Sequence, residues 1–163
     1  VMKAKLLEVL GDALDGLVKA RGTEGRKMAD LIVQRLEGIR EIIGEVKTFL
    51  PEIAQAYRTR LEEKLAEVKD QLDPGRLEQE MVMFLQKTDV AEELDRLVVH
   101  IEEVQRVLEK PEPAGRRLDF LMQEFNREAN TLCSKAQNTT LTEVGLELKT
   151  VIDQMREQVQ NIE

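Results

Sequence analysis

The sequence predicts an all-α protein, built as an antiparallel bundle of six to seven helices. Hydrophobic residues make up 42% of its 163 residues and charged residues 34%, whereas aromatic residues make up only 3%. A composition rich in leucine, glutamate, lysine, arginine and glutamine is typical of long helices that pack side by side. Apolar residues also recur three and four positions apart, which is the spacing of one helix face. A β-sandwich or barrel would show more alternation of aromatic and β-branched residues.

The first half of the chain is expected to form two or three helices. Residues 3–20 place Leu6, Leu10 and Leu14 on one side of a helix, which Arg21-Gly22-Thr23 is expected to end. Thr23 can cap the next helix. Pro51 is expected to kink that helix or to start another, and the apolar pattern continues to Leu72. Residues 24–72 would then form a long helical hairpin, which either projects from the bundle or folds back on it.

The second half is divided by clear turn and capping signals. Asp73-Pro74-Gly75 precedes a helix over residues 76–87. Asp89, with Glu92 three residues later, resembles a capping box for a helix from residue 90 to Lys110. A Pro-Gly segment at residues 112–115 separates this helix from the next, over residues 115–136. Thr140 with Glu143 repeats the capping pattern before a last helix that reaches Ile162. Six or seven helices with short connections favour an antiparallel bundle.

Charge and missing motifs restrict the function. The net charge of −8 argues against a broad electrostatic surface for nucleic acid, but it is compatible with a site where a divalent metal supplies positive charge. The sequence lacks a glycine-rich phosphate loop and the HExxH, CxxC and GxSxG motifs. The single cysteine, Cys133, lies on an apolar stripe and is expected to be buried. No signal peptide or apolar run of about 20 residues is visible, so we expect a cytoplasmic protein without a membrane partner.

Four polar residues lie along one border of the apolar stripe expected for residues 90–110: Asp89, Glu93, Arg96 and His100. His100 is the only histidine and can act as a general acid or base, or as a metal ligand. The two carboxylates are oxygen donors that suit Mg²⁺ or Mn²⁺. In the alternative interpretation, Asp89 is only a cap, Glu93 and Arg96 form surface ion pairs, and His100 has no function.

The helix over residues 115–136 carries an unusual number of amide side chains. Its first border holds Asp119, Gln123, Asn126 and Asn130, and Glu124, Glu128 and Lys135 lie toward the other border. Phe120 points away from the core, which suggests contact with another subunit, another domain or a stacked base. The basic groups nearest this surface suit phosphate: Arg116, Arg117, Arg127 and Lys135. The alternative is that the amides only satisfy neighbouring polar groups inside the bundle.

Three strings of residues resemble a known family. GRRLDFLMQEFNREANTLCSKAQNTTLTEVGLELKTVIDQMREQVQNIE (115–163) resembles the C-terminal segment of the YicC-like endoribonucleases, also called the YicC/YloC or stress-induced family. RLEQEMVMFLQKTDVAEELDRLVVHIEE (76–103) resembles the preceding signature, and RGTEGRKMADLIVQRLEGI (21–39) is a looser match. Val99 departs from the family pattern, which leads us to expect a small polar residue beside His100.

The resemblance covers essentially the whole chain, residues 1–163, which it identifies as the C-terminal helical domain of such a protein, with the family's N-terminal domain absent. It implies a bacterial cytosolic enzyme that cleaves RNA with a divalent metal and assembles as a homo-hexamer.

The resulting hypothesis is metal-assisted cleavage of RNA. His100, Glu93 and Asp119 are the expected catalytic residues, with His100 moving a proton. The expected metal ligands, for Mn²⁺ or Mg²⁺, are Asp89, Glu93, Asp119, Glu124 and Glu128. The expected RNA contacts are Arg96, Arg116, Arg117, Asn126, Arg127, Asn130 and Lys135. The alternative is a non-catalytic helical scaffold, with the chemistry in the N-terminal domain. Convergence of Asp89, Glu93, His100 and Asp119 within about 5–6 Å would favour the enzyme, whereas side chains that point to different faces would favour the scaffold.

Overall fold

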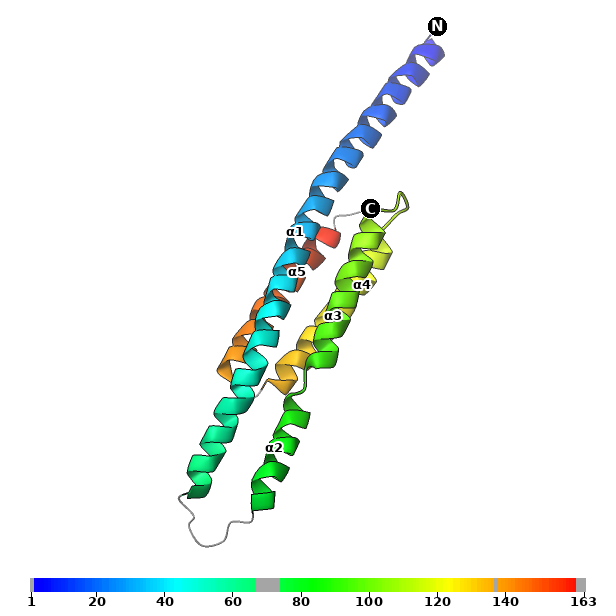
Figure 1. Ribbon diagram of the computed structural model, residues 1–163. Coiled ribbons are helices and arrows are strands. Elements are labelled where there is room, and N and C mark those ends of the chain that lie inside the picture. The colour runs from blue at the N-terminus through cyan, green and yellow to red at the C-terminus, as the bar shows by residue number, and fades with distance from the viewer. Residues whose placement is uncertain (1, 67–73, 137, 161–163) are drawn as a thin grey trace.

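The computed structural model describes residues 2–66, 74–136 and 138–160. Within these ranges the protein contains no strand and five helices: α1 (Met2–Ala66), α2 (Pro74–Thr88), α3 (Ala91–Leu108), α4 (Gly115–Lys135) and α5 (Thr139–Val159). Figure 1 shows an elongated molecule in which α1 runs along the whole bundle and projects beyond it at the N-terminal end. The all-α class is therefore confirmed, whereas the expected count of six to seven helices is wrong.

The count was too high because both expected breaks lie inside α1. The hydroxyl of Thr23 does not cap a new helix; it donates to the carbonyl oxygen of Lys19 at 2.9 Å, one turn earlier in the same helix. The helix does not end at Gly22 either. No glycine of the described residues adopts the positive φ that commonly terminates a helix. Pro51 also lies within α1, although it lacks the N–H for one backbone hydrogen bond.

The hairpin expected over residues 24–72 takes a different form. Residues 24–66 are all part of α1, and residues 67–72 lie outside the described residues. α2 packs against the C-terminal part of α1 (Figure 1), so the two arms of the observed hairpin are α1 and α2. Across this contact, the rings of Tyr57 and Phe84 stack with centroids 3.7 Å apart.

Capping of the later helices also differs from expectation. The Asp89 carboxylate accepts from the backbone N–H of Ala91 at 3.0 Å, but Glu92 pairs with Arg96 rather than closing a capping box. α5 begins at Thr139, and its N-cap is Asn138, whose side-chain oxygen accepts from the N–H of Leu141 at 2.7 Å. The cap expected at Thr140 is therefore wrong. Asp73 lies outside the described residues.

The core is formed by the middle of α1 together with α3, α4 and α5, with α4 packed against both α3 and α5. The stripe expected in α3 is buried from Val90 to Val104, because it meets α1 and α4 at helical spacing. α5 approaches α4 closely at Gly145, where an added Cβ would lie 2.5 Å from the sulfur of Cys133. Cys133 itself is only half-buried.

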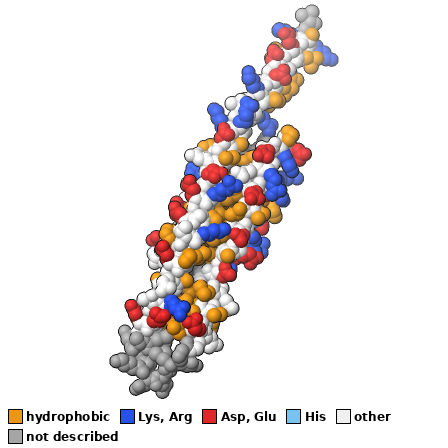
Figure 2. Space-filling model, in the orientation of Figure 1, with side chains coloured by type: hydrophobic (Ala, Val, Ile, Leu, Met, Phe, Trp, Pro, Cys, Tyr) orange, Lys and Arg blue, Asp and Glu red, His pale blue; other side chains and the backbone are white. Residues whose placement is uncertain are grey.

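The N-terminal part of α1 projects beyond the rest of the described bundle (Figure 1). Residues 2–24 are all exposed, and Figure 2 shows hydrophobic side chains on this projecting end. The apolar side of the expected first helix is thus at the surface: Leu6, Leu7, Leu10, Leu14, Leu17 and Val18. No helix in the described part of the chain is both long and apolar enough to cross a membrane.

Candidate functional site

The contact between α3 and α4 brings a histidine and two carboxylates together. His100 of α3 and Glu124 and Glu128 of α4 each have a ligand atom within 4.8 Å of those of the other two. The two glutamates are four residues apart and so share one face of α4. Two ligand atoms of one ion at about 2.1 Å from it are at most about 4.2 Å apart. Small side-chain rotations would therefore let all three residues bind one cation.

The imidazole of His100 has an unsatisfied nitrogen. Its Nε2 is shielded from solvent and has no hydrogen-bond partner in the described structure, although buried polar atoms normally have one. The ring lies beside Phe125, with centroids 5.7 Å apart and planes tilted by 58°. A nitrogen lone pair or N–H left in this state is costly, and a bound cation or a proton-sharing group would satisfy it.

Arg96 fixes the buried carboxylate of this cluster. Glu128 is 3% exposed, and Nε of Arg96 donates to its Oε2 at 2.9 Å. The same guanidinium binds Glu92 at 2.6 Å and Glu93 at 3.3 Å. The hydrogen bond that Arg96 donates to Glu128 is the main reason that the pKa of Arg96 is raised above its ordinary value. Arg96 is thus a permanent cation that holds Glu128 in place next to His100.

A second buried carboxylate links α3 to α4 further along. Glu93 is 2% exposed, and the ammonium of Lys135 donates to both of its oxygens, at 2.9 and 3.1 Å. Lys135 also donates to the backbone oxygen of Asp89 at 2.7 Å. Glu93 is not one of the three residues whose ligand atoms meet, and Lys135 and Arg96 neutralise its carboxylate.

The two aspartates expected in the site lie elsewhere. The side chain of Asp89 is engaged at the start of α3, and Asp119 accepts from Nε2 of Gln123 at 2.9 Å, one turn along α4. Asp89, Glu93, His100 and Asp119 do not form one group; His100 instead meets Glu124 and Glu128. Both glutamates were expected as ligands, but they were not paired with His100, because no residue pattern shows which border of α4 faces α3.

The amide border of α4 faces α5 and lines a shallow groove. Its walls are Gln123, Asn126, Arg127, Asn130 and Thr131 of α4 and Arg156 of α5. Arg156 was not singled out from the sequence, since it shows no pattern beyond that of an exposed helix residue. Nη1 of Arg127 lies 3.9 Å from the carboxylate of Glu124. Arg127 therefore connects the groove to the cluster around His100.

The remaining basic candidates lie near the start of α4. Arg116 is exposed, and Arg117 donates to Glu103 of α3 at 3.1 Å. The guanidinium of Arg117 also lies 5.5 Å from the centre of the Phe120 ring, which is 48% exposed. The hydrogen bond to Glu103 and the contact with Phe120 hold the guanidinium of Arg117 between α3 and the Phe120 ring.

The helical bundle and its sequence together define the class of this protein. The family model described as "Endoribonuclease YicC-like, C-terminal" matches residues 46–163, and the chain belongs to the YicC-like endoribonuclease family.

Two relatives carry the name "Probable endoribonuclease YicC". The one from Haemophilus influenzae is 46% identical to this chain over 158 residues, and the one from Clostridioides difficile is 34% identical over 161 residues. Each match covers 97% of this chain and 55% of the relative. The chain thus spans about half the length of the curated relatives it matches.

Proposed function

We propose that this chain is a domain of an endoribonuclease that cleaves RNA phosphodiester bonds with the help of a divalent metal, Mn²⁺ or Mg²⁺. The observation that carries the proposal is the meeting of one ring nitrogen of His100 with the carboxylates of Glu124 and Glu128. The buried Nε2 of His100, which has no hydrogen-bond partner in the described structure, supports it. The names of the relatives agree with an RNA substrate. A cytoplasmic location is part of the same proposal.

The donor set fits such an ion. One imidazole and two carboxylates suit Mn²⁺, and Mg²⁺ with more difficulty, because Mg²⁺ prefers oxygen ligands only. Counting Glu92 and Glu93, four carboxylates stand against Arg96, Lys135 and the exposed Arg127, so the area keeps excess negative charge for a cation. A metal at His100, Glu124 and Glu128 would supply Lewis-acid activation of water and of the scissile phosphate.

Other residues of the chain position this site and the RNA. Arg96 orients Glu128, and Lys135 with Arg96 neutralises Glu93 and joins α3 to α4. Arg127 and Arg156 offer guanidinium groups to RNA phosphates along the groove. Asn126 and Asn130 can reach ribose hydroxyls from the same groove. Asp89 and Asp119 have no role in this proposal, because their carboxylates are engaged elsewhere.

Binding of Mn²⁺ tests the site without relying on turnover. We expect calorimetric titration of the chain to show one Mn²⁺ site that His100→Ala and Glu124→Gln weaken at least tenfold. Glu147→Gln is the matched control, since Glu147 is an exposed glutamate of α5. Cleavage of a labelled RNA should be lost in the same two variants and on addition of EDTA.

The results distinguish a metal ligand, a proton relay and a residue of a non-catalytic scaffold. If His100→Ala keeps Mn²⁺ binding but loses cleavage, His100 relays a proton and is not a ligand. If both variants bind Mn²⁺ and cleave RNA as the wild type does, the site is wrong and the scaffold alternative gains support.

The scaffold alternative has its own observation, the apolar stripe on residues 6–18 of α1, in which Leu10 and Leu14 are 55% and 52% exposed. We propose that a second copy of the chain covers this stripe and that self-association, expected to reach a hexamer, is part of the function. Leu10→Glu with Leu14→Glu should lower the mass measured by sedimentation, whereas Asp12→Glu on the same segment should not. An unchanged mass would contradict this contact.

A further inference from the structure

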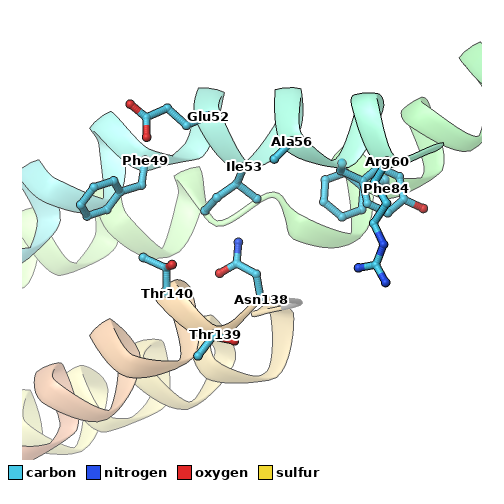
Figure 3. A pocket seen from close by; sticks show the side chains of 10 residues that line it. Phe49, Glu52, Ile53, Ala56, Arg60, Phe84, Asn138, Thr139 and Thr140 are labelled. Atoms are coloured by element: carbon cyan, nitrogen blue, oxygen red, sulfur yellow. The ribbon is translucent and has the colours of Figure 1, made fainter. Parts of the chain in front are cut away.

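A cavity of about 440 Å³ lies where the C-terminal half of α1, α2 and the start of α5 meet. Figure 3 shows its walls: Phe49, Ile53 and Arg60 from α1, Phe84 from α2, and Asn138 with Thr140 from the start of α5. None of its lining residues belongs to α3 or α4, so the cavity is separate from the cluster around His100. Its volume is within the range of cavities that hold small ligands.

One side of the cavity is apolar and aromatic. The rings of Tyr57 and Phe84, which come from different helices, are stacked with an angle of 5° between their planes. Phe84 is 7% exposed, whereas Tyr57 is only half-buried, so the stack has a fixed inner ring and an accessible outer one. Ile53 continues the apolar wall. A flat, apolar platform of this kind is what a nucleic-acid base stacks on.

The opposite side offers hydrogen-bond donors. The oxygen of the Asn138 side chain accepts from the N–H of Leu141, so the amide nitrogen is the end left for a ligand. In Figure 3 this nitrogen points across the cavity toward α1, and Thr140 points the same way. An apolar occupant would leave the amide nitrogen of Asn138 without a partner, which is costly at a desolvated contact.

One cation, Arg60, and one carboxylate, Glu52, also line the cavity. Arg60 lines the same cavity as Phe84 and forms no ion pair with the described residues. The neighbouring Arg58 instead pairs with both Glu62 and Glu78. Figure 3 shows the carboxylate of Glu52 on the side of α1 away from Asn138. The cavity therefore presents an aromatic wall, amide and hydroxyl donors, a guanidinium that pairs with no described carboxylate, and the carboxylate of Glu52.

We propose that this cavity binds one unpaired nucleotide of the RNA substrate, with the base against Tyr57, the Asn138 amide donating to the base, and Arg60 pairing with its phosphate. The proposal rests on the proposed function, because it assigns a second contact to the same substrate. A base that is paired in a duplex cannot enter such a cavity. The protein should therefore prefer single-stranded RNA.

The chain offers a built-in reporter of this cavity. Tyr57 is its single tyrosine, and the chain has no tryptophan, so tyrosine emission comes from the cavity wall alone. With EDTA present to prevent cleavage, titration with a hexanucleotide of uridine should quench this emission to saturation. Arg60→Ala should weaken the RNA affinity at least fivefold. Phe84→Leu should also weaken the affinity, because Phe84 supports the Tyr57 ring on which the base would stack, and such stacking is worth on the order of tenfold in affinity.

The controls separate binding from folding. Arg35→Ala removes another exposed arginine of α1, roughly 37 Å away at 1.5 Å per residue, and should leave quenching unchanged. Arg60 is exposed, so Arg60→Ala should keep the wild-type circular dichroism melt even if Phe84→Leu does not. In a titration followed by anisotropy of labelled RNA, Tyr57→Phe should retain affinity and Tyr57→Ala should lose it.

The outcomes distinguish this proposal from the proposed function. Absence of quenching, with affinity unchanged in Arg60→Ala, overturns the nucleotide site even if RNA is cleaved and Mn²⁺ binds at His100. Saturable, Arg60-dependent quenching upholds it even if the His100 and Glu124 variants cleave RNA normally. Tyrosine emission that changes with protein concentration and not with RNA overturns it in favour of a second copy in the cavity.

Discussion

The two borders of α4 start from the same sequence pattern and end in different physical states. On the border that faces α3, Glu128 is almost completely buried, and Arg96 holds it beside His100. On the border that faces α5, Asn126 and Asn130 line an open groove with Arg156. Because an ionised group buried without a partner is very costly, the first border needs a precise network of charges. The second border is open to solvent, which satisfies its polar groups, so it needs no such network.

Under the proposed function, this difference gives the two borders different tasks. The α3 border combines low solvent access, fixed carboxylates and an unpaired nitrogen, which are the properties of a site for a cation. The α5 border combines amides with two exposed guanidinium groups, which can bind a flexible polyanion with little strain. Variants along both borders can therefore test the comparison, beginning with the largest expected effect.

Glu93→Gln should have the largest effect on stability. The variant leaves Lys135 and Arg96 without their shared buried anion, and we expect a loss of about 2–3 kcal/mol, below the range for fully buried pairs because both cations are partly exposed. Glu92→Gln is the matched control, since the Glu92 side chain is 75% exposed. Urea denaturation would measure the free energy of unfolding of both variants. Equal values would mean that the charges on the α3 border contribute no more to stability than an exposed charge does.

Gly145→Ala should disturb the contact between α4 and α5. The new Cβ would lie 2.5 Å from the Cys133 sulfur, so either the Cys133 side chain must rotate or the two helices must shift. We expect a cost of about 1–2 kcal/mol. Gly38→Ala has open space around the new Cβ and should instead stabilise α1 by about 0.5–1 kcal/mol. Thermal melts of both variants test this opposite sign. A stabilising Gly145→Ala would show that the two helices do not pack as described.

Arg156→Ala should weaken RNA binding without changing Mn²⁺ binding. If Arg156 contacts one phosphate, the slope of log affinity against log salt should fall by about 0.7, the value for single strands. The measurement is fluorescence anisotropy of labelled RNA at several salt concentrations. Lys149→Ala on the same helix is the control. A loss of Mn²⁺ affinity in Arg156→Ala would mean that the two borders do not act separately.

Arg117→Ala should have the smallest effect, and it should depend on pH. The hydrogen bond from Arg117, aided by the charges of Arg106 and Lys110, lowers the pKa of Glu103 below its ordinary value of 4.5. A lowered pKa in the folded state stabilises the protein above the unfolded value and loses that effect as the pH falls through the folded value.

The difference in melting temperature between wild type and Arg117→Ala should therefore be small at neutral pH and disappear in strong acid. Arg116→Ala, next to it and exposed, should show no such trend. A difference that grows on acidification would contradict the assigned pair.

Much of this protein follows from sequence patterns alone. The periodic apolar residues of α3 and α5 predicted their buried faces, since helix geometry fixes which side chains share a side. The strings around Glu124 and His100 carried the resemblance that the family match confirms. The sequence pattern did not predict that α1 continues without a break through Gly22 and Pro51. A local helix breaker costs only a few kcal/mol, and the helical turns on both sides can supply more stabilisation than that.

Only the tertiary structure decided which polar residues meet. His100 could face either border of α4 as far as periodicity shows, and the packing of α3 chose Glu124 and Glu128 over Asp119. The pairing of Lys135 with Glu93 spans 42 positions, and the cavity at Tyr57 joins α1, α2 and α5. Local sequence determines the faces of each helix, but contacts between faces depend on how the helices rotate and slide to fill one common core.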